Sequence, residues 1–297
     1  MNILIVGGTG FLGTHFCEQL SVGNKVTVLS KYRNKFIKEI NNITYHYEDW
    51  RVLNFDNLFA KDKYDKVLLI GWSGHPRSSN DQLLDHFESN VSPTIKLIDK
   101  VMRDTQAEIY FLSSYGGLPN VDSGFSKQSV SGYAASKLSV EVHLEAYSRR
   151  FDRKSTVFRL SNPYGCYQDF EGSQGIIPIF IYKALNSQKI PIFDGIETSK
   201  DYIYAIDAVN KMISRMFTSA CSGFSLVPII SGQNFSILDI LAHIELHIPL
   251  LDLVPSELKS KVSSHSQKIL CMLSSSDAHK SFSIHLEDLI RWVKESC

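Results

Sequence analysis

The opening of this 297-residue chain contains the pattern that most restricts its fold. Residues 2–6 are mostly apolar and include β-branched side chains, which predicts a buried strand. A glycine-rich turn, Gly7-Gly8-Thr9-Gly10, follows directly, and a helical pattern begins at Phe11. A strand, a tight turn and a helix in this order are typical of the first unit of a parallel α/β sheet.

The glycines of this turn suit the binding of a dinucleotide. Gly7 permits the sharp turn, Gly10 lets the backbone approach a pyrophosphate, and Gly13 lets the helix pack closely on the strand. The first helical residues, Phe11, Leu12 and Gly13, offer free backbone N–H groups to the phosphate. A glycine repeat alone is weak support, but its position after the first strand predicts a dinucleotide site.

Strands and helices continue to alternate after this unit. We expect strands at residues 25–29, 43–47, 64–72 and 108–112, and helices at residues 11–20, 80–103 and 133–150. This alternation predicts an α/β protein with a doubly wound parallel sheet whose ligands bind at the carboxyl ends of the strands. Residues 255–268, rich in serine and lysine, are expected to form an exposed loop.

The end of the second strand indicates the cofactor. A site for NAD usually places Asp or Glu there, on the ribose 2′-hydroxyl. Here Ser30 holds that position, with Lys31 and Arg33 close behind. A hydroxyl and two cations attract a 2′-phosphate, so we expect NADP(H), with NAD possible; alternatively, both cations are solvated loop charges. Asp49, after the third strand, is placed to face the adenine amino group.

Composition narrows the partners. Lys and Arg (31) balance Asp and Glu (31), so no charge field favours nucleic acid. The five cysteines are scattered and form no Cys-x-x-Cys pair, which predicts neither a disulfide framework nor a metal site. Apolar runs are of strand length, the chain starts at its first strand, and we therefore expect a cytoplasmic protein without a signal peptide or membrane partner.

A tyrosine and a lysine supply the chemistry. Tyr133 and Lys137 are four residues apart on an expected helix, so their side chains share one face. A free tyrosine titrates near pH 10. A neighbouring ammonium, together with the positive nicotinamide of an oxidised cofactor, favours the phenolate and lowers its pKa. Ser114, after the fifth strand, can donate to the substrate oxygen that Tyr133 protonates, and Lys137 can bond the nicotinamide ribose. Together with the glycine turn, these residues predict redox catalysis.

Five segments stand in a fixed order along the chain: residues 7–13 (GGTGFLG), 113–114 (SS), 133–137 (YAASK), 159–165 (RLSNPYG) and 201–207 (DYIYAID). In this order they resemble the extended short-chain dehydrogenase/reductases, specifically the branch of nucleotide-sugar epimerases, dehydratases and reductases. The resemblance implies a Rossmann NAD(P)-binding domain at residues 1–160, to which a segment near 201–231 returns. It also implies a smaller lobe, residues 161–297, that grips a nucleoside-diphosphate sugar, and a homodimer formed through helices 80–103 and 132–150.

The resemblance also assigns residues. Ser114, Tyr133 and Lys137 match the family's catalytic trio, and Asn162 matches a residue that commonly contacts the substrate. Where the family usually has an arginine that binds the substrate diphosphate, this chain has Lys200. Lysine keeps the charge but lacks the bidentate fork of arginine, so we expect diphosphate binding by a single cationic point.

Three functions remain open. Dehydratases of this branch carry Thr before an Asp-Glu pair, which the segment 113–116 lacks, so dehydration is disfavoured. The cationic end of the second strand favours an NADPH-dependent reductase of a 4-keto-6-deoxy nucleoside-diphosphate sugar, which makes a deoxysugar nucleotide for surface polysaccharide. The alternatives are an NAD-dependent nucleotide-sugar 4-epimerase and a non-catalytic NADP(H)-sensing protein, although such sensors usually lose the tyrosine or the lysine.

Overall fold

The computed structural model describes residues 1–33, 35–36, 39–74, 83–115, 131–192, 195–218, 222–250 and 252–297. The chain divides into two compact units. The first comprises Met1–Ser161 and Val209–Ile229, and the second comprises Asn162–Ala208 and Ile230–Cys297. In the part of the chain covered by these ranges, no helix has both the length and the apolar character that crossing a membrane requires.

The first unit is built on a seven-stranded sheet in the order β3-β2-β1-β4-β5-β6-β9. All neighbouring strands are parallel. The strands are β1 (Asn2–Val6), β2 (Lys25–Ser30), β3 (Ile43–Tyr47), β4 (Lys66–Leu69), β5 (Glu108–Ser114), β6 (Ser155–Leu160) and β9 (Phe224–Ile229). The strand order reverses between β1 and β4, which confirms the predicted doubly wound sheet and places its switch point there.

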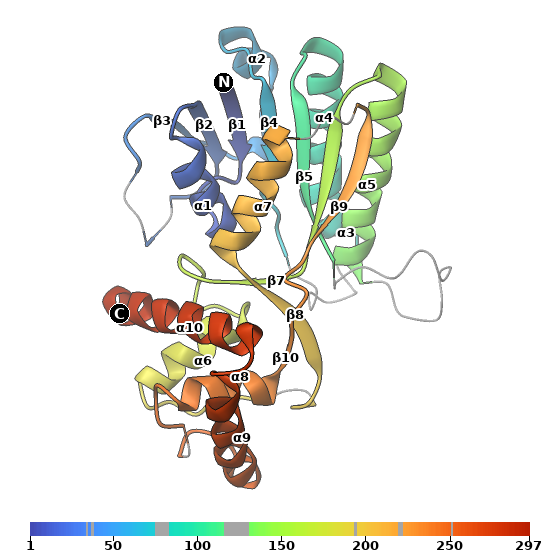
Figure 1. Cartoon of the computed structure of the whole chain (residues 1–297). Helices are drawn as coiled ribbons and strands as arrows, with labels where there is room; N and C mark the ends of the chain where they lie inside the picture. The colour runs from blue at the N-terminus through green and yellow to red at the C-terminus, as the bar shows by residue number, and fades with distance from the viewer. Residues whose placement is uncertain are drawn as a thin grey trace. The chain divides into compact units, whose positions relative to one another are not determined.

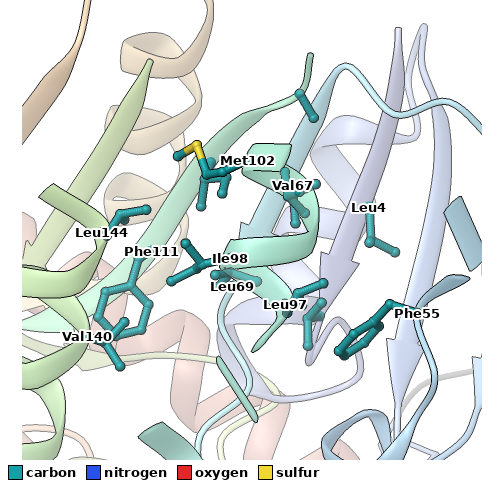
Figure 2. Close-up of a cluster of buried hydrophobic side chains, with 14 of the residues drawn as sticks. Leu4, Phe55, Val67, Leu69, Leu97, Ile98, Met102, Phe111, Val140 and Leu144 are labelled. Carbon is teal, nitrogen blue, oxygen red and sulfur yellow. The ribbon is translucent and has the colours of Figure 1, made fainter. Parts of the chain in front are cut away.

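Helices cover both faces of this sheet. They are α1 (Phe11–Leu20), α2 (Asp56–Lys61), α3 (Leu83–His86), α4 (Ser92–Asp104), α5 (Gly132–Phe151) and α7 (Ala205–Thr218). Helices α4 and α5 lie on one face, and α1 with residues 209–218 of α7 lies on the other (Figure 1). Figure 2 shows the core beneath α4 and α5, where buried aliphatic and aromatic side chains of the helices meet those of the strands: Ile98, Met102, Val140, Leu144, Val67, Leu69 and Phe111.

Strand β4 ends earlier than the predicted residue 72. After Leu69, the backbone N–H groups of Ile70 and Gly71 both donate to the carbonyl of Val6, at 3.0 and 2.8 Å. The chain leaves the ladder here because it passes directly against the glycine turn. A Cβ atom added to Gly7 would lie only 2.4 Å from the Cα of Gly71. Strand β5 instead runs two residues further than predicted, through the serine pair.

The helix predicted at residues 80–103 is interrupted; residues 80–82 lie outside the described part of the chain. A π-helical turn, Phe87–Val91, separates α3 from α4. Asn90 in this turn is buried, and its side chain accepts a hydrogen bond from the N–H of Ser73 (2.7 Å) and donates one to the Ser73 carbonyl (3.0 Å). The π turn therefore fixes the backbone that follows β4, in keeping with the frequent placement of such turns at functional sites.

The second unit contains a three-stranded sheet in the order β10-β8-β7. Its elements are β7 (Asn162–Tyr164), α6 (Ile176–Leu185), β8 (Ser199–Tyr204), β10 (Asn234–Ser236), α8 (Ile237–Glu245), α9 (Lys259–Met272) and α10 (Asp277–Ser296). A reciprocal capping box between Ser236 and Asp239 begins α8. Asp239 also contacts His265 of α9 at 2.7 Å, so one carboxylate links the start of α8 to the next helix.

The prediction of an exposed loop at residues 255–268 is wrong. A short 3₁₀ turn, Ser256–Leu258, leads into helix α9. Helix α9 buries Val262, Ser266 and Ile269, which are four and three residues apart and therefore lie on one face. The serine- and lysine-rich composition hid this narrow stripe, because only two of its three members are apolar.

Two glutamates of α5, each paired with an arginine, allow a matched test of how burial affects the contribution of an ion pair to stability. Glu141 is 4% exposed and contacts Arg159 of β6 at 2.6 Å, whereas Glu145 contacts Arg149 at the surface. We expect Glu141→Ala to lower the free energy of unfolding by about 3 kcal/mol, because it leaves a half-buried guanidinium without its partner. Glu145→Ala should cost about 0.5 kcal/mol or less. Urea unfolding checks both, and equal losses would contradict the assignment.

Candidate active site

Two glycines of the turn after β1 are required by the fold itself. Gly7 has a φ of +87°, which side chains rarely adopt. A Cβ atom on Gly13 would lie 2.3 Å from the carbonyl oxygen of Gly7 and 2.7 Å from the backbone of Gly8. The first turn of α1 therefore packs directly on the glycine turn, whereas the spacing predicted that Gly13 would let the helix pack on the strand.

Gly10 is different, because nothing in the fold demands a glycine there. Its backbone is extended (φ −78°, ψ 178°), and an added Cβ atom would meet only the carbonyl oxygen of Gly7, at 3.4 Å. Gly10 also occupies the N-cap of α1 and has no side chain with which to cap the first N–H groups, at Phe11, Leu12 and Gly13. The open space and the uncapped donors fit the pyrophosphate of a dinucleotide.

The predicted cofactor-selecting residues lie at the end of β2 and directly after it. Ser30 is buried, and its hydroxyl accepts a hydrogen bond from the backbone N–H of Thr9 (3.3 Å), so it also holds the glycine turn. Lys31 contacts Asp49 at 3.3 Å. Arg33 is 75% exposed and contacts Glu39 at 3.6 Å. Each cation thus has a carboxylate partner, which a 2′-phosphate would have to share.

Asp49 is held by a residue that sequence reasoning missed. Both of its carboxylate oxygens accept hydrogen bonds from Arg51, at 2.7 Å to Nε and 2.6 Å to Nη2. This fork, together with Lys31, keeps the pKa of the Asp49 carboxyl well below its usual range. The signal available in the sequence was an arginine two residues after an aspartate that begins a short turn. The predicted contact of Asp49 with adenine stays a prediction.

Ser114, Tyr133 and Lys137 are brought together at the carboxyl end of β5. Ser114 is the last residue of β5, and its side chain hydrogen-bonds the Tyr133 hydroxyl. Ser131 caps α5 by accepting a hydrogen bond from the N–H of Ala134 (3.2 Å), so the helix begins just before Tyr133. Lys137 follows one turn later and is 4% exposed.

In the protein alone, the Lys137 ammonium does not produce the predicted lowering of the Tyr133 pKa, and the contribution expected from an oxidised nicotinamide stays a prediction. Burial raises the pKa of Tyr133, and the hydrogen bond with Ser114 lowers it by less. The Lys137 ammonium does not reach the phenol; it donates to the carbonyl of Leu112 (2.7 Å) and lies 5.9 Å from the centre of the Tyr133 ring. Tyr133 is therefore protonated at neutral pH, in the form that can donate a proton.

The predicted substrate-binding residues of the second unit lie on neighbouring strands, β7 and β8. Asn162 donates a hydrogen bond to the carbonyl of Asp201 (2.8 Å), and Lys200 is exposed on β8. The Asp201 carboxylate accepts hydrogen bonds from the backbone N–H groups of Ser231 (3.0 Å) and Gly232 (2.7 Å). Asp201 thus fixes the turn that leads to β10, and the roles of Asn162 and Lys200 stay predictions.

The sheet order, the glycine turn and the Ser–Tyr–Lys trio define a Rossmann-fold protein of the short-chain dehydrogenase/reductase class. The model of the NAD dependent epimerase/dehydratase family matches residues 3–220, and the chain belongs to this family. This confirms the resemblance found in the sequence.

Three known proteins illustrate the similarity. The chain is 26% identical over 226 residues to dTDP-4-dehydro-6-deoxyglucose reductase of Escherichia coli, covering 70% of each chain. It is 29% identical over 215 residues to a putative UDP-glucose 4-epimerase of Methanocaldococcus jannaschii, covering 69% of this chain and 70% of that one. Its fold is similar to UDP-glucuronic acid 4-epimerase from Bacillus cereus, solved with UDP-glucuronic acid and NAD (TM-score 0.75, 19% identity, 99% of both chains).

Gly10 and Gly13 form a matched pair that separates binding from folding. Gly13→Ala should lower the free energy of unfolding by about 1–3 kcal/mol, because the new methyl group collides with backbone. Gly10→Ala should leave the melting temperature unchanged and weaken dinucleotide binding, because the methyl group fills the space proposed for the pyrophosphate. Thermal unfolding and NADPH titration measure the two effects. Wild-type dinucleotide affinity in Gly10→Ala would contradict the assignment.

Proposed function

We propose that this protein is an NADPH-dependent reductase of a 4-keto-6-deoxy nucleoside-diphosphate sugar, whose product is a deoxysugar nucleotide used for surface polysaccharide. The observation that carries the proposal is the placement of Tyr133, hydrogen-bonded to Ser114, on the helix that also carries a buried Lys137. The similarity to the reductase of Escherichia coli supports the same chemistry.

The residues of the trio divide the work on the substrate carbonyl. When bound, the nicotinamide cofactor supplies the hydride to the keto carbon. Ser114 donates a hydrogen bond to the carbonyl oxygen, and Tyr133 transfers its proton to that oxygen as negative charge develops on it. Lys137, one helical turn after Tyr133 on the same face of α5, is proposed to bond the nicotinamide ribose. Asn162 and Lys200 are proposed to bind the sugar and its diphosphate.

The residues at the end of β2 favour reduction over epimerisation. Ser30 stands where an NAD site usually has Asp or Glu, and Lys31 and Arg33 follow it. A reductase draws on NADPH, whereas a 4-epimerase recycles a bound NAD. The second candidate is nevertheless an NAD-dependent nucleotide-sugar 4-epimerase, because two of the similar proteins are 4-epimerases by name.

A homodimer is part of this proposal. Large apolar side chains are exposed on α3, on the π turn and on α5: Leu83 (55%), Leu84 (66%), Phe87 (48%) and Val142 (64%). Exposed apolar clusters of this kind are typical of surfaces that bind another protein. They support the pairing of two helices from each copy that the family resemblance implies.

Arg33 tests the preference for NADPH. Arg33→Ala should weaken NADPH binding on the order of tenfold and change NADH binding little, because only the 2′-phosphate offers the guanidinium a charged hydrogen-bond partner. Glu39→Gln should act in the opposite direction, since it removes the carboxylate that now competes for Arg33. Fluorescence titration with both nucleotides measures the effect. Equal losses of affinity for NADPH and NADH would show that Arg33 is a solvated loop charge that does not bind the 2′-phosphate.

Tyr133→Phe tests the reaction. The variant should lower kcat by about 10²–10⁴-fold with the fold intact, because it removes the proton donor. Tyr115→Phe, a change at an exposed tyrosine next to Ser114, is the control and should keep wild-type kcat. NADPH consumption with 4-keto-6-deoxy nucleotide sugars measures both.

Mass spectrometry of the purified protein separates the alternatives. Bound NAD⁺ favours the epimerase, and consumption of added NADPH favours the reductase. Tight NADP(H) binding without turnover favours the sensing protein. Wild-type activity in Tyr133→Phe would remove this residue from the mechanism.

A further inference from the structure

The ammonium of Lys137 is enclosed mainly by aromatic rings. Its Nζ atom lies 3.8 Å from the centre of the Trp72 ring, 4.8 Å from the centre of the Phe111 ring and 5.9 Å from the centre of the Tyr133 ring. We call these three side chains the aromatic cage. The hydrogen bond of the ammonium goes to the carbonyl of Leu112, at 2.7 Å. A buried cation is thus held by one carbonyl and by the faces of aromatic rings.

No carboxylate forms an ion pair with the Lys137 ammonium in the described part of the chain. Glu141 lies one turn after Lys137 on α5, but its two oxygens are bound by Arg159 of β6, at 2.6 Å to Nη2 and 3.2 Å to Nε. Within the described residues, no Asp or Glu lies within ion-pair distance of Lys137. A buried ammonium is costly unless other groups compensate for lost water, and the negative faces of aromatic rings do so.

Trp72 is the nearest ring of the cage, and the fold holds it firmly. Its indole packs against Phe111, with ring centres 5.7 Å apart at an angle of 55°. The following residue, Ser73, is clamped on its N–H and its carbonyl by the side chain of Asn90. Among the described residues the indole Nε1 has no hydrogen-bond partner, so packing and the ammonium set the direction of the ring.

We propose that Trp72 is a positioning residue of the reaction, whose indole face holds the Lys137 ammonium in place and favours its charged form. This inference rests on the role proposed above for Lys137. Trp72 would thereby set the pH range in which Tyr133 and Lys137 act together, without touching the reacting atoms itself.

The groups that face Lys137 give the sign of the effect. Helix α5 contributes Tyr133 and Glu141, whose carboxylate is paired with Arg159 of β6. Strand β5 contributes Phe111 with the carbonyl of Leu112, and the segment after β4 contributes Trp72. Burial lowers the pKa of Lys137, and Glu141 opposes this to a smaller extent. Because a cation–π contact stabilises only the charged form, removal of the indole should lower this pKa further. Activity that requires the ammonium would then be lost at a lower pH.

Fluorescence tests the contact without cofactor or substrate. In a Trp50→Phe/Trp292→Phe background, Trp72 is the sole tryptophan of the chain, which has three. Its emission should follow one titration, below the ordinary pH range of a lysine, as Lys137 loses its proton. The titration should vanish with Lys137→Met and persist with Tyr133→Phe. A flat emission, or the same titration with Lys137→Met, would overturn the proposal.

The pH profile of kcat tests the consequence. Trp72→Leu should shift the alkaline limb down by about one pH unit, as expected for the loss of a desolvated cation–π contact, and Trp72→Phe should recover part of the shift. An unmoved limb in a Trp72→Leu protein with wild-type melting temperature would overturn the proposal. If Trp72→Leu does not fold, the fluorescence titration decides. If the wild type turns over no keto sugar, the proposed function fails while the optical result still decides whether Trp72 holds Lys137.

Discussion

The meeting of backbone segments at Gly7, with no side chain between them, is the constraint on which the rest of the first unit depends. Gly71 approaches it from the end of β4, and Gly13 approaches it from the first turn of α1. This contact places the N-terminus of α1 beside the open space at Gly10. It also ends β4 early, so that Trp72 emerges where β5 and α5 present Phe111 and Lys137. One steric requirement therefore shapes both the turn proposed to bind the dinucleotide and the surroundings of the proposed catalytic trio.

Local patterns predicted the parts of the fold that depend on nearby residues. The strand, turn and helix at residues 2–20 follow from a run of apolar and β-branched residues and from the glycine spacing, and α1 has the predicted bounds. The Tyr133–Lys137 spacing likewise placed both side chains on one face of α5. The errors came from contacts distant in sequence: the end of β4 at the glycine turn and the helix at 259–272, whose apolar stripe packs against other elements. Such contacts cannot be read from periodicity alone.

The electrostatics of the trio show the same limit. The four-residue spacing on one helix face predicted that the Lys137 ammonium lowers the pKa of Tyr133. Burial outweighs that effect for Tyr133, and the ammonium is directed to a carbonyl and to aromatic rings instead. A residue pair seen in sequence gives proximity, whereas the hydrogen-bond partners and the desolvation that set each pKa come from the third dimension. Arg51 was missed for a similar reason, because its importance lies in the fork that it forms with Asp49.

Strand β9, which completes the sheet of the first unit, is synthesised well after its neighbour β6. Strand β9 pairs with β6 along its length, although the whole of residues 162–208 is synthesised between them. Until β9 emerges, β6 presents an unpaired row of backbone donors and acceptors that another chain can pair with. Co-translational folding of the first unit therefore has to wait until Ile229 has been synthesised, and a nascent chain stalled before that point is an aggregation hazard.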